Sequence, residues 1–595
     1  MKYLDMVKNG EIPSEEMLLD IVQNSADQGS GKDTELQQYI KLLNNALVQA
    51  QLPEESLLLI KTLFALENYI SRDEAFVLFI QRVIKLHVHK IPSEFGDFVK
   101  ELSQYYSADL IMQTLQAQLK NLHLKQDEEF RSFFNWSLHI FWNTKQLLNS
   151  DKWTSWYEDL KKLLKVLVEQ KRASEVMYVE FFIYHVMGNS FQKIDQWKEY
   201  NENVIKLTEP LYKENTNDLT RLDKKEKSKK RIAFVVDRVV ENSVFQVNYS
   251  FLKALKENDE FNKKYEIGVY TVNYFEKSKD DPECIKMIEE LGIHFINPVR
   301  KFTLDGYYND HLEKAKHLAQ TLIFDEIDIM IAGGAMPIID YLYLARIAPL
   351  QIYYSHGNCA FNIEGINKRI SHFPQECEEF AWEILSVPLD RKFLVGEPKD
   401  KEKAKIIKER YEKEFGKDLV ILGTIGRLIK IDSQEYLETV AKIMQENPNT
   451  IYLACGLGNI NSIKSKLKKL NIDEKRFIFT GQINAHVYGW VIDIFLDTFP
   501  LRGGSAKAEY MAKGYGILVI NLQAYSGQVY QVSKELKDKY DCLEYPIASN
   551  KEEYIYYVKK AIKEKKYIEI ISNLQRQRIL QEEQVVKQFI NTLGE

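Results

Sequence analysis

The chain has 595 residues, which is more than one ordinary domain holds and suggests three or four domains. Hydrophobic residues make up 45% and charged residues 28%, which argues against a wholly disordered chain and against a membrane channel. Eighty basic against 86 acidic residues give a net charge of -6, so the global basic field of a nucleic-acid-binding protein is not expected.

Targeting and redox signals favour the cytoplasm. No stretch of 18 uninterrupted apolar residues is present, so we expect no transmembrane segment. The first 25 residues carry acids throughout and lack the apolar core of a signal peptide. The five cysteines form no CxxC pair, which is typical of a reducing compartment.

Residues 1–220 have the periodicity of an all-α domain. Leu36, Ile40, Leu43 and Leu47 follow one helical stripe, and Pro53 opens the next segment. Runs of roughly 17–20 residues predict stacked helical hairpins, without a clean tetratricopeptide signature. Further helices are expected to start near Arg72, Pro92, Ala108, Asp127, Lys152, Ser174 and Gln192.

Two features of this region have a functional and a purely structural interpretation, and the structural one is favoured for both. The aromatic residues between Phe130 and Trp142 have helical spacing, which favours a core over a peptide-binding groove. His87 and His89 stand at i and i+2, which do not share a helix face, so a metal-binding pair is disfavoured.

A charged segment, 221–230, is typical of a solvated linker.

From residue 231 to 396, short β-rich runs alternate with helices, which predicts a buried parallel sheet in a doubly wound Rossmann-like domain. The expected strands are 232–236, 266–270, 293–296, 327–332 and 351–354.

The alternation then repeats. Residues 397–418 predict an interdomain surface helix, 419–550 a second Rossmann-like domain, and 551–595 C-terminal helices. Ligands of such sheets bind at the carboxyl ends of the strands and at helix N-termini, which favours a phosphate-bearing ligand in the cleft between the two domains. The expected strands are 419–425, 451–455, 477–480, 492–496 and 517–520.

The strand ends of the second domain carry the most informative residues. Gly503, Gly504, Ser505 and Ala506 follow a buried strand and open a helix, where small residues let a diphosphate approach backbone N–H groups. Glu509 lies about one turn further, where a carboxylate can accept hydrogen bonds from ribose hydroxyls. The alternative is a tight turn with a solvated Glu509.

Two other strand ends bring cations and a histidine to the same edge. Arg427 and Lys430 follow the strand that opens this domain, where two cations can neutralise a diphosphate leaving group. His486 follows the third expected strand and could stack on a base. A surface lysine and an ordinary loop histidine are the alternatives.

In their order and spacing, these stretches resemble the donor-binding half of GT-B glycosyltransferases, and most closely the O-GlcNAc transferase family with its bacterial relatives that glycosylate adhesins in the cytoplasm. The run Arg346-Ile-Ala-Pro-Leu-Gln351, which leads into Tyr353-Tyr-Ser-His-Gly357, is similar to that family's R-x-A-P-x-Q run. A helical region before two Rossmann-like halves also fits the family layout.

The resemblance implies a role for each matched residue. Lys430 would contact the donor diphosphate, His486 would pack on the nucleobase of a UDP-sugar, and Gly504, Ser505 and Ala506 would cradle the phosphates. Glu509 would hold the ribose and His356 would face the sugar or the acceptor. The acceptor would be a protein such as an adhesin or flagellin, held by the helical domain, which could instead form a homo-oligomer.

The chain departs from the family at three points. Ser505-Ala506 replaces a Thr pair, Glu509 replaces Asp, and a His of some members is missing from the first βα loop. Asp237, Glu241 and His356 therefore all remain candidates for the catalytic base.

The sequence has no D-x-D motif, and Glu509 does not complete the E-x7-E pattern of many retaining GT-B enzymes, since Leu501 and Arg502 stand where the first glutamate would be sought. We therefore expect a metal-independent, inverting enzyme with no cofactor beyond its donor substrate. The alternatives are a non-catalytic partner or chaperone subunit of a protein glycosylation system, and a sugar-nucleotide epimerase.

Overall fold

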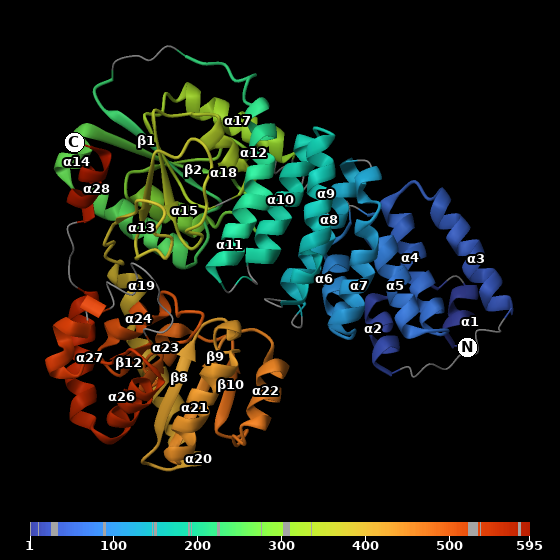
Figure 1. The fold of residues 1–595 in the computed structure, drawn as a ribbon. Coiled ribbons are helices and arrows are strands. Elements are labelled where there is room, and N and C mark those ends of the chain that lie inside the picture. Colours follow the sequence, from blue (N-terminus) through green and yellow to red (C-terminus); the bar gives the residue numbers. More distant parts are fainter. Residues whose placement is uncertain are drawn as a thin grey trace.

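A helical arm and two stacked α/β halves make up the molecule (Figure 1). The computed structural model describes residues 2–9, 11–24, 34–86, 91–125, 127–144, 147, 151–188, 191, 193–222, 227–274, 277–300, 310–334, 336–521, 534–535, 537–580 and 585–594. No helix within these ranges is both long enough and apolar enough to span a membrane.

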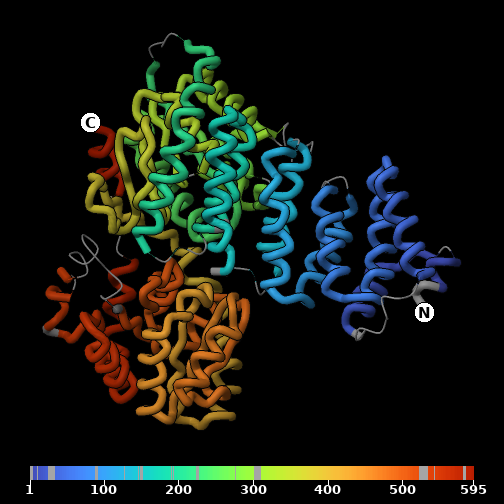
Figure 2. Tube along the Cα trace, turned by 45° about the vertical axis from the view of Figure 1, so that its right-hand side comes forward, coloured from blue at the N-terminus to red at the C-terminus, as the bar shows by residue number. Residues whose placement is uncertain are grey.

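The arm consists of helical hairpins stacked side by side, as predicted (Figure 2). Ser71 and Ser107 begin two of these helices by accepting hydrogen bonds from backbone N–H groups that lack a partner within the helix. Pro53 occupies the first turn of a third helix, where its missing N–H costs nothing. The elements are α1 (Lys2–Lys8), α2 (Glu15–Asn24), α3 (Thr34–Gln49), α4 (Pro53–Asn68), α5 (Arg72–Val83), α6 (Ser93–Ser103), α7 (Ala108–Leu119), η1 (Leu122–Leu124), α8 (Asp127–Asn143), η2 (Asp151–Trp156), α9 (Tyr157–Glu169), α10 (Ala173–Gly188), α11 (Ile194–Tyr200), η3 (Asn201–Ile205) and α12 (Lys206–Glu214).

The aromatic residues of α8 form core, as expected: Phe130, Phe134 and Phe141 are fully buried, and Trp142 packs at the edge of the same cluster. The histidines at 87 and 89 lie outside the described residues. The arm shares one continuous core with the first α/β half. At this junction Phe181 of α10 contacts the ring of Tyr274 at a centroid distance of 4.8 Å.

The first half contains a seven-stranded sheet whose described strands are all parallel, in the order β3-β2-β1-β4-β5-β6-β7. The five expected strands are confirmed, and β6 and β7 are additional. The elements are β1 (Lys230–Val236), α13 (Ser243–Lys256), α14 (Asp259–Lys264), β2 (Tyr265–Thr271), α15 (Pro282–Glu290), β3 (His294–Ile296), α17 (His311–Phe324), β4 (Ile329–Ala332), α18 (Pro337–Leu344), β5 (Leu350–Ser355), β6 (Lys368–Ser371), β7 (Glu383–Ile384) and α19 (Arg391–Val395).

Helix α20 (Pro398–Phe415) leads into the second half, a six-stranded parallel sheet in the order β10-β9-β8-β11-β12-β13. The five expected strands are confirmed here too, and β13 is additional. The elements are β8 (Val420–Ile425), η4 (Leu428–Lys430), α21 (Gln434–Glu446), β9 (Thr450–Cys455), α22 (Ile460–Lys469), β10 (Phe477–Gly481), α23 (Ala485–Tyr488), β11 (Ile494–Leu496), α24 (Ala506–Lys513), β12 (Ile517–Asn521), η6 (Asp541–Leu543), β13 (Ile547–Ala548), α26 (Lys551–Lys563), α27 (Lys565–Ile579) and α28 (Val585–Leu593).

The last helix returns to the first half. Whereas α26 and α27 pack on the second sheet, α28 lies against α13 and places the buried Phe589 on Phe251, with ring centroids 5.1 Å apart. Figure 1 shows α28 beside α13 and α14. The chain therefore crosses between the halves twice, and both sheets have the strand order of a Rossmann fold.

Candidate functional site

The predicted phosphate loop runs from β11 into α24 and is organised by a buried carboxylate. Asp497 is fully buried and accepts hydrogen bonds from the backbone N–H of Gly503 and from Nζ of Lys507, each at 3.1 Å. Thr498 closes the turn by donating its hydroxyl to the carbonyl of Leu501. These contacts hold the two glycines at the start of α24, where the N–H groups of the first turn have no partner within the helix.

Lys430 reaches this loop from the neighbouring strand. A Cβ atom added at Gly504 would lie 3.5 Å from Nζ of Lys430, so the ammonium group stands directly over the glycine. The structure therefore brings Lys430 to Gly504, one of the residues of the predicted phosphate loop. No described residue offers the Lys430 ammonium group a hydrogen bond or an ion pair.

The charge around Lys430 is mostly positive. Burial, together with the nearby Arg427, Lys507 and Arg502, lowers the pKa of Lys430 to about 8, while Asp497 opposes the shift. A cation in this position gains more from a bound anion than an exposed lysine does, because the protein supplies it with little compensation.

Lys513, at the other end of α24, contacts both His486 and the backbone of Glu509. Lys513 lies between them, since its Nζ donates to the carbonyl of Glu509 at 2.9 Å and lies 3.4 Å from Nδ1 of His486. Burial raises the pKa of Glu509, and burial together with Lys513 lowers the pKa of His486. His486 also packs on Gly396, where an added Cβ would lie 2.7 Å from its Cβ atom. His486 thus contacts the segment that joins the two halves.

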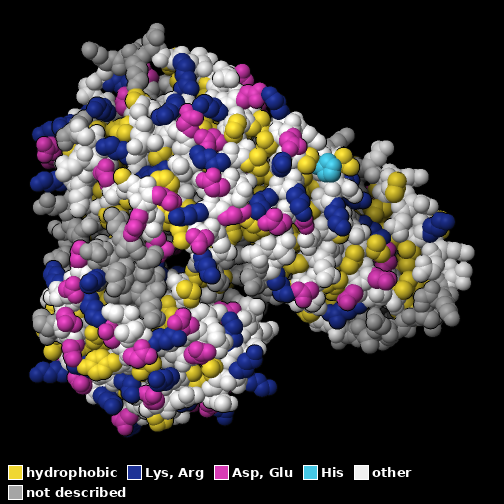
Figure 3. All heavy atoms as spheres, viewed as in Figure 1, with side chains coloured by type: hydrophobic (Ala, Val, Ile, Leu, Met, Phe, Trp, Pro, Cys, Tyr) yellow, Lys and Arg dark blue, Asp and Glu magenta, His cyan; other side chains and the backbone are white. Residues whose placement is uncertain are grey.

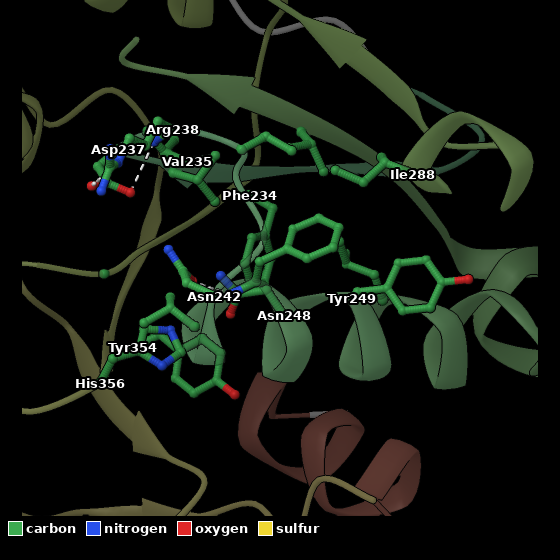
Figure 4. Close-up of a pocket in the computed structure, with 17 residues that line it drawn as sticks. Phe234, Val235, Asp237, Arg238, Asn242, Asn248, Tyr249, Ile288, Tyr354 and His356 are labelled. Atoms are coloured by element: carbon green, nitrogen blue, oxygen red, sulfur yellow. Dashed lines mark hydrogen bonds and ion pairs between the residues drawn. The ribbon is translucent and has the colours of Figure 1, made fainter. Parts of the chain in front are cut away.

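The opposite wall of the cleft carries the candidates for the base. A cavity of about 50 Å³ lies at the carboxyl ends of β1 and β5, and Asp237, Asn242, Tyr354 and His356 are among its lining residues (Figure 4). The exposed Glu241 does not line it.

Two of the three candidates therefore share this cavity, but their charge states differ. Burial opposes ionisation of Asp237, yet Lys277, whose Nζ lies 2.6 Å away, and Arg238 outweigh burial and lower the pKa of Asp237. Burial and the neighbouring His372 lower the pKa of His356 to about 3, so its imidazole is neutral at neutral pH. Its Nδ1 is buried and has no hydrogen-bond partner among the described residues. Both groups are therefore unprotonated at neutral pH, and they differ in their partners: Lys277 engages the carboxylate of Asp237, whereas Nδ1 of His356 has no partner among the described residues and can accept a proton.

Sequence reasoning missed His372. The register of β5 and β6 places Ser355 beside Ser371, so the next residue of each strand end, His356 and His372, lies on the same side of the cleft. Their ring centroids are 5.4 Å apart, and burial lowers the pKa of His372 to about 4. The signal was the repeated Ser-His at the ends of two β-rich runs, but the run that precedes His372 is too short to identify as a strand.

An ion pair crosses the cleft. Arg502 of the phosphate loop binds Glu376, which lies four residues after His372. Figure 3 shows the surface hollowed between the two halves, with basic and acidic side chains interspersed over the visible face. Within the described residues, no three side chains of His, Cys, Asp or Glu converge as a metal site requires.

Comparison with known proteins identifies the fold. No family model and no curated protein matches the sequence. Among solved structures, a mutant of the Thermobaculum terrenum O-GlcNAc transferase is 15% identical and superposes with a TM-score of 0.54, covering 95% of this chain and 98% of that one.

Two weaker matches cover about three fifths of this chain. They are Anabaena Alr3699/HepE in complex with UDP (14% identity, TM-score 0.42, 61% of this chain and 99% of that one) and WaaG, a glycosyltransferase involved in lipopolysaccharide biosynthesis (12%, 0.40, 60% and 98%). The agreement with the transferase extends over the arm and both halves, so the chain has the GT-B fold, with two Rossmann-like domains preceded by an all-α domain.

Proposed function

We propose that this protein is a metal-independent, inverting glycosyltransferase that moves a sugar from a UDP-sugar to a protein acceptor. One observation carries the proposal: the ammonium group of Lys430 stands over Gly504 at the start of α24, without a partner among the described residues. A diphosphate at this position would supply the missing negative charge and accept hydrogen bonds from the backbone of the phosphate loop.

The arrangement favours charge stabilisation of a leaving group. As the bond between the anomeric carbon and the diphosphate breaks, negative charge develops on the diphosphate. Lys430, with Arg427, Arg502 and Lys507 nearby, is placed to stabilise that charge. These cations supply what a divalent metal supplies in other transferases, which is the reason for proposing metal independence.

His356 is the residue we propose as the base. It faces the cavity on the other wall and is neutral at neutral pH, so it can take a proton from an acceptor hydroxyl or amide as that group attacks the anomeric carbon. Direct attack from the wall opposite the diphosphate inverts the anomeric configuration. The helical arm is the part of the chain that we propose holds the acceptor protein.

Calorimetric titration tests the donor site. We expect UDP to bind more tightly than GDP, and Lys430→Ala to weaken UDP binding by about 1.5–3 kcal/mol, or roughly 10- to 150-fold. Uridine, which has no phosphate, should bind the variant and the wild type alike. Lys442→Ala, which removes an exposed lysine of α21 in the same half, is the matched control.

Three outcomes separate the alternatives. A folded protein that binds neither nucleotide would favour the non-catalytic partner. Equal loss of UDP and uridine binding in Lys430→Ala would place Lys430 away from the diphosphate. Interconversion of a UDP-sugar with its epimer, without transfer, would favour the epimerase.

A further inference from the structure

Two buried cysteines lie side by side in the first half, in the loops that follow β5 and β6. Cys359 follows the end of β5 and Cys377 follows the end of β6. Because these parallel strands are neighbours, their exit loops run together and bring the two sulfurs to 3.1 Å. Both side chains are buried, with 5% and 1% of their surface exposed.

The two thiols are not equivalent. A hydrogen bond joins the two sulfurs, and this contact, together with hydrogen bonds from the backbone of Cys377 and Glu376, lowers the pKa of Cys359 against the opposing effect of burial. The same contact with Cys359, together with burial, raises the pKa of Cys377. Cys359 is thus the better nucleophile, and Cys377 keeps its proton.

The other cysteines with described side chains lack these features. Burial raises the pKa of Cys284 to about 11 and that of Cys455 to about 12. Neither has a second sulfur beside it among the described residues. Among these four cysteines, we therefore expect a peroxide to react with Cys359, whose neighbour Cys377 can resolve the product, and not with Cys284 or Cys455.

We propose that Cys359 and Cys377 form a redox modification site, in which a small peroxide converts the dithiol reversibly to a disulfide. The Cys359 thiolate attacks one peroxide oxygen, which breaks the O–O bond and gives a sulfenic acid and one water after protonation. The Cys377 sulfur then attacks the sulfenic sulfur, which forms the S–S bond and releases a second water. Two thiols lose two hydrogens, and one hydrogen peroxide is reduced to two waters.

The geometry requires little movement. A disulfide has sulfurs about 2.05 Å apart, so the two loops need to approach by about 1 Å. Since Cys377 directly follows Glu376, the bond also restrains the carboxylate that pairs with Arg502 across the cleft. Oxidation should therefore slow backbone hydrogen exchange in the exit loops of β5 and β6.

The test uses the intact wild-type protein and is independent of the proposed transferase activity. The folded protein is treated with hydrogen peroxide, the excess is removed with catalase, and the remaining thiols are alkylated in denaturant. We expect loss of two of the five thiols, a cross-linked peptide pair containing Cys359 and Cys377, and recovery of all five thiols after dithiothreitol.

Two variants sharpen the result. Cys455→Ser, which removes an inert buried thiol, should lose the same two thiols. Cys377→Ser should form no cross-link and should leave a sulfenic acid at Cys359 that dimedone traps. Retention of all five thiols by the treated wild type, cross-linking of another pair, or irreversible oxidation of Cys359 without a cross-link would each overturn the proposal.

Discussion

Replacing Lys430 by methionine should stabilise the empty protein and weaken its affinity for UDP. Methionine keeps most of the aliphatic stem and removes the charge that burial disfavours. The pKa of Lys430 falls from 10.5 to about 8 on folding. That difference corresponds to about 3 kcal/mol, of which we expect roughly 1–3 kcal/mol to be measured because the side chain is partly exposed to water.

The size of this stabilisation depends on pH. Below pH 8 the lysine is charged in both the folded and the unfolded state, and the folded state carries the full cost of burying the charge. Between pH 8 and 10.5 the folded state releases the proton first, so the cost diminishes. The gain of Lys430→Met should therefore be complete at pH 7 and nearly absent at pH 10.5.

Thermal unfolding with and without UDP is the assay. For a domain of this size a gain of 1 kcal/mol raises the midpoint by about 2–4 °C. We expect a higher midpoint for the variant than for the wild type without UDP, and a smaller rise than in the wild type when UDP is added. Lys442→Met, on the exposed face of α21, should change neither value. A variant that is less stable at pH 7, or that gains as much stability from UDP as the wild type does, would refute the reasoning.

Three further variants test the acceptor wall, the cleft and the C-terminal helix. The folded state holds His356 and His372 neutral, whereas the unfolded chain protonates them below pH 6.5. The free energy of unfolding of the wild type should therefore fall as the pH is lowered from 6.5 to 4.5. In urea titrations, His356→Asn should show a fall that is about 1–2 kcal/mol smaller. Glu376→Gln should remove the ion pair that crosses the cleft and increase the radius of gyration in solution scattering, whereas Glu379→Gln, at a surface pair with Lys198, should not. Phe589→Ala should cost about 3–5 kcal/mol in urea unfolding of the first half, because the ring is fully buried against α13.

The sequence allowed the strands, and the residues at the edge where the strands end, to be predicted for a physical reason. A buried parallel strand such as β4 or β9 is a continuous apolar run, and the residue that follows it stands at the ligand-binding edge. Lys430 and Gly504 could thus be assigned to one edge without knowledge of their contacts. The strand β6 was missed because Lys368–Ser371 has one strongly apolar residue, Ile370, and owes its place to pairing with β5.

Relations between distant segments could not be predicted. The apolar stripe of α28 indicates a buried face, but it does not reveal that the face packs on the first sheet and not the second. Arg502 and Glu376 are 126 residues apart, and each alone resembles a solvated surface charge. The periodicity of apolar residues indicates which side of a helix or strand is buried, but it does not indicate which other element packs against that side.

The shared core of the arm and the first half constrains how the two substrates can meet. Phe181 of the arm is fully buried and packs on Tyr274 and His311 of the first half, so these parts move as one body. The chain passes to the second half only at the segment around Gly396 and between α27 and α28. A rotation of the second half about these connections would move the phosphate loop relative to His356 and leave the geometry between the arm and His356 unchanged. An acceptor held on the arm would remain aligned with His356 while the second half carries the donor towards it.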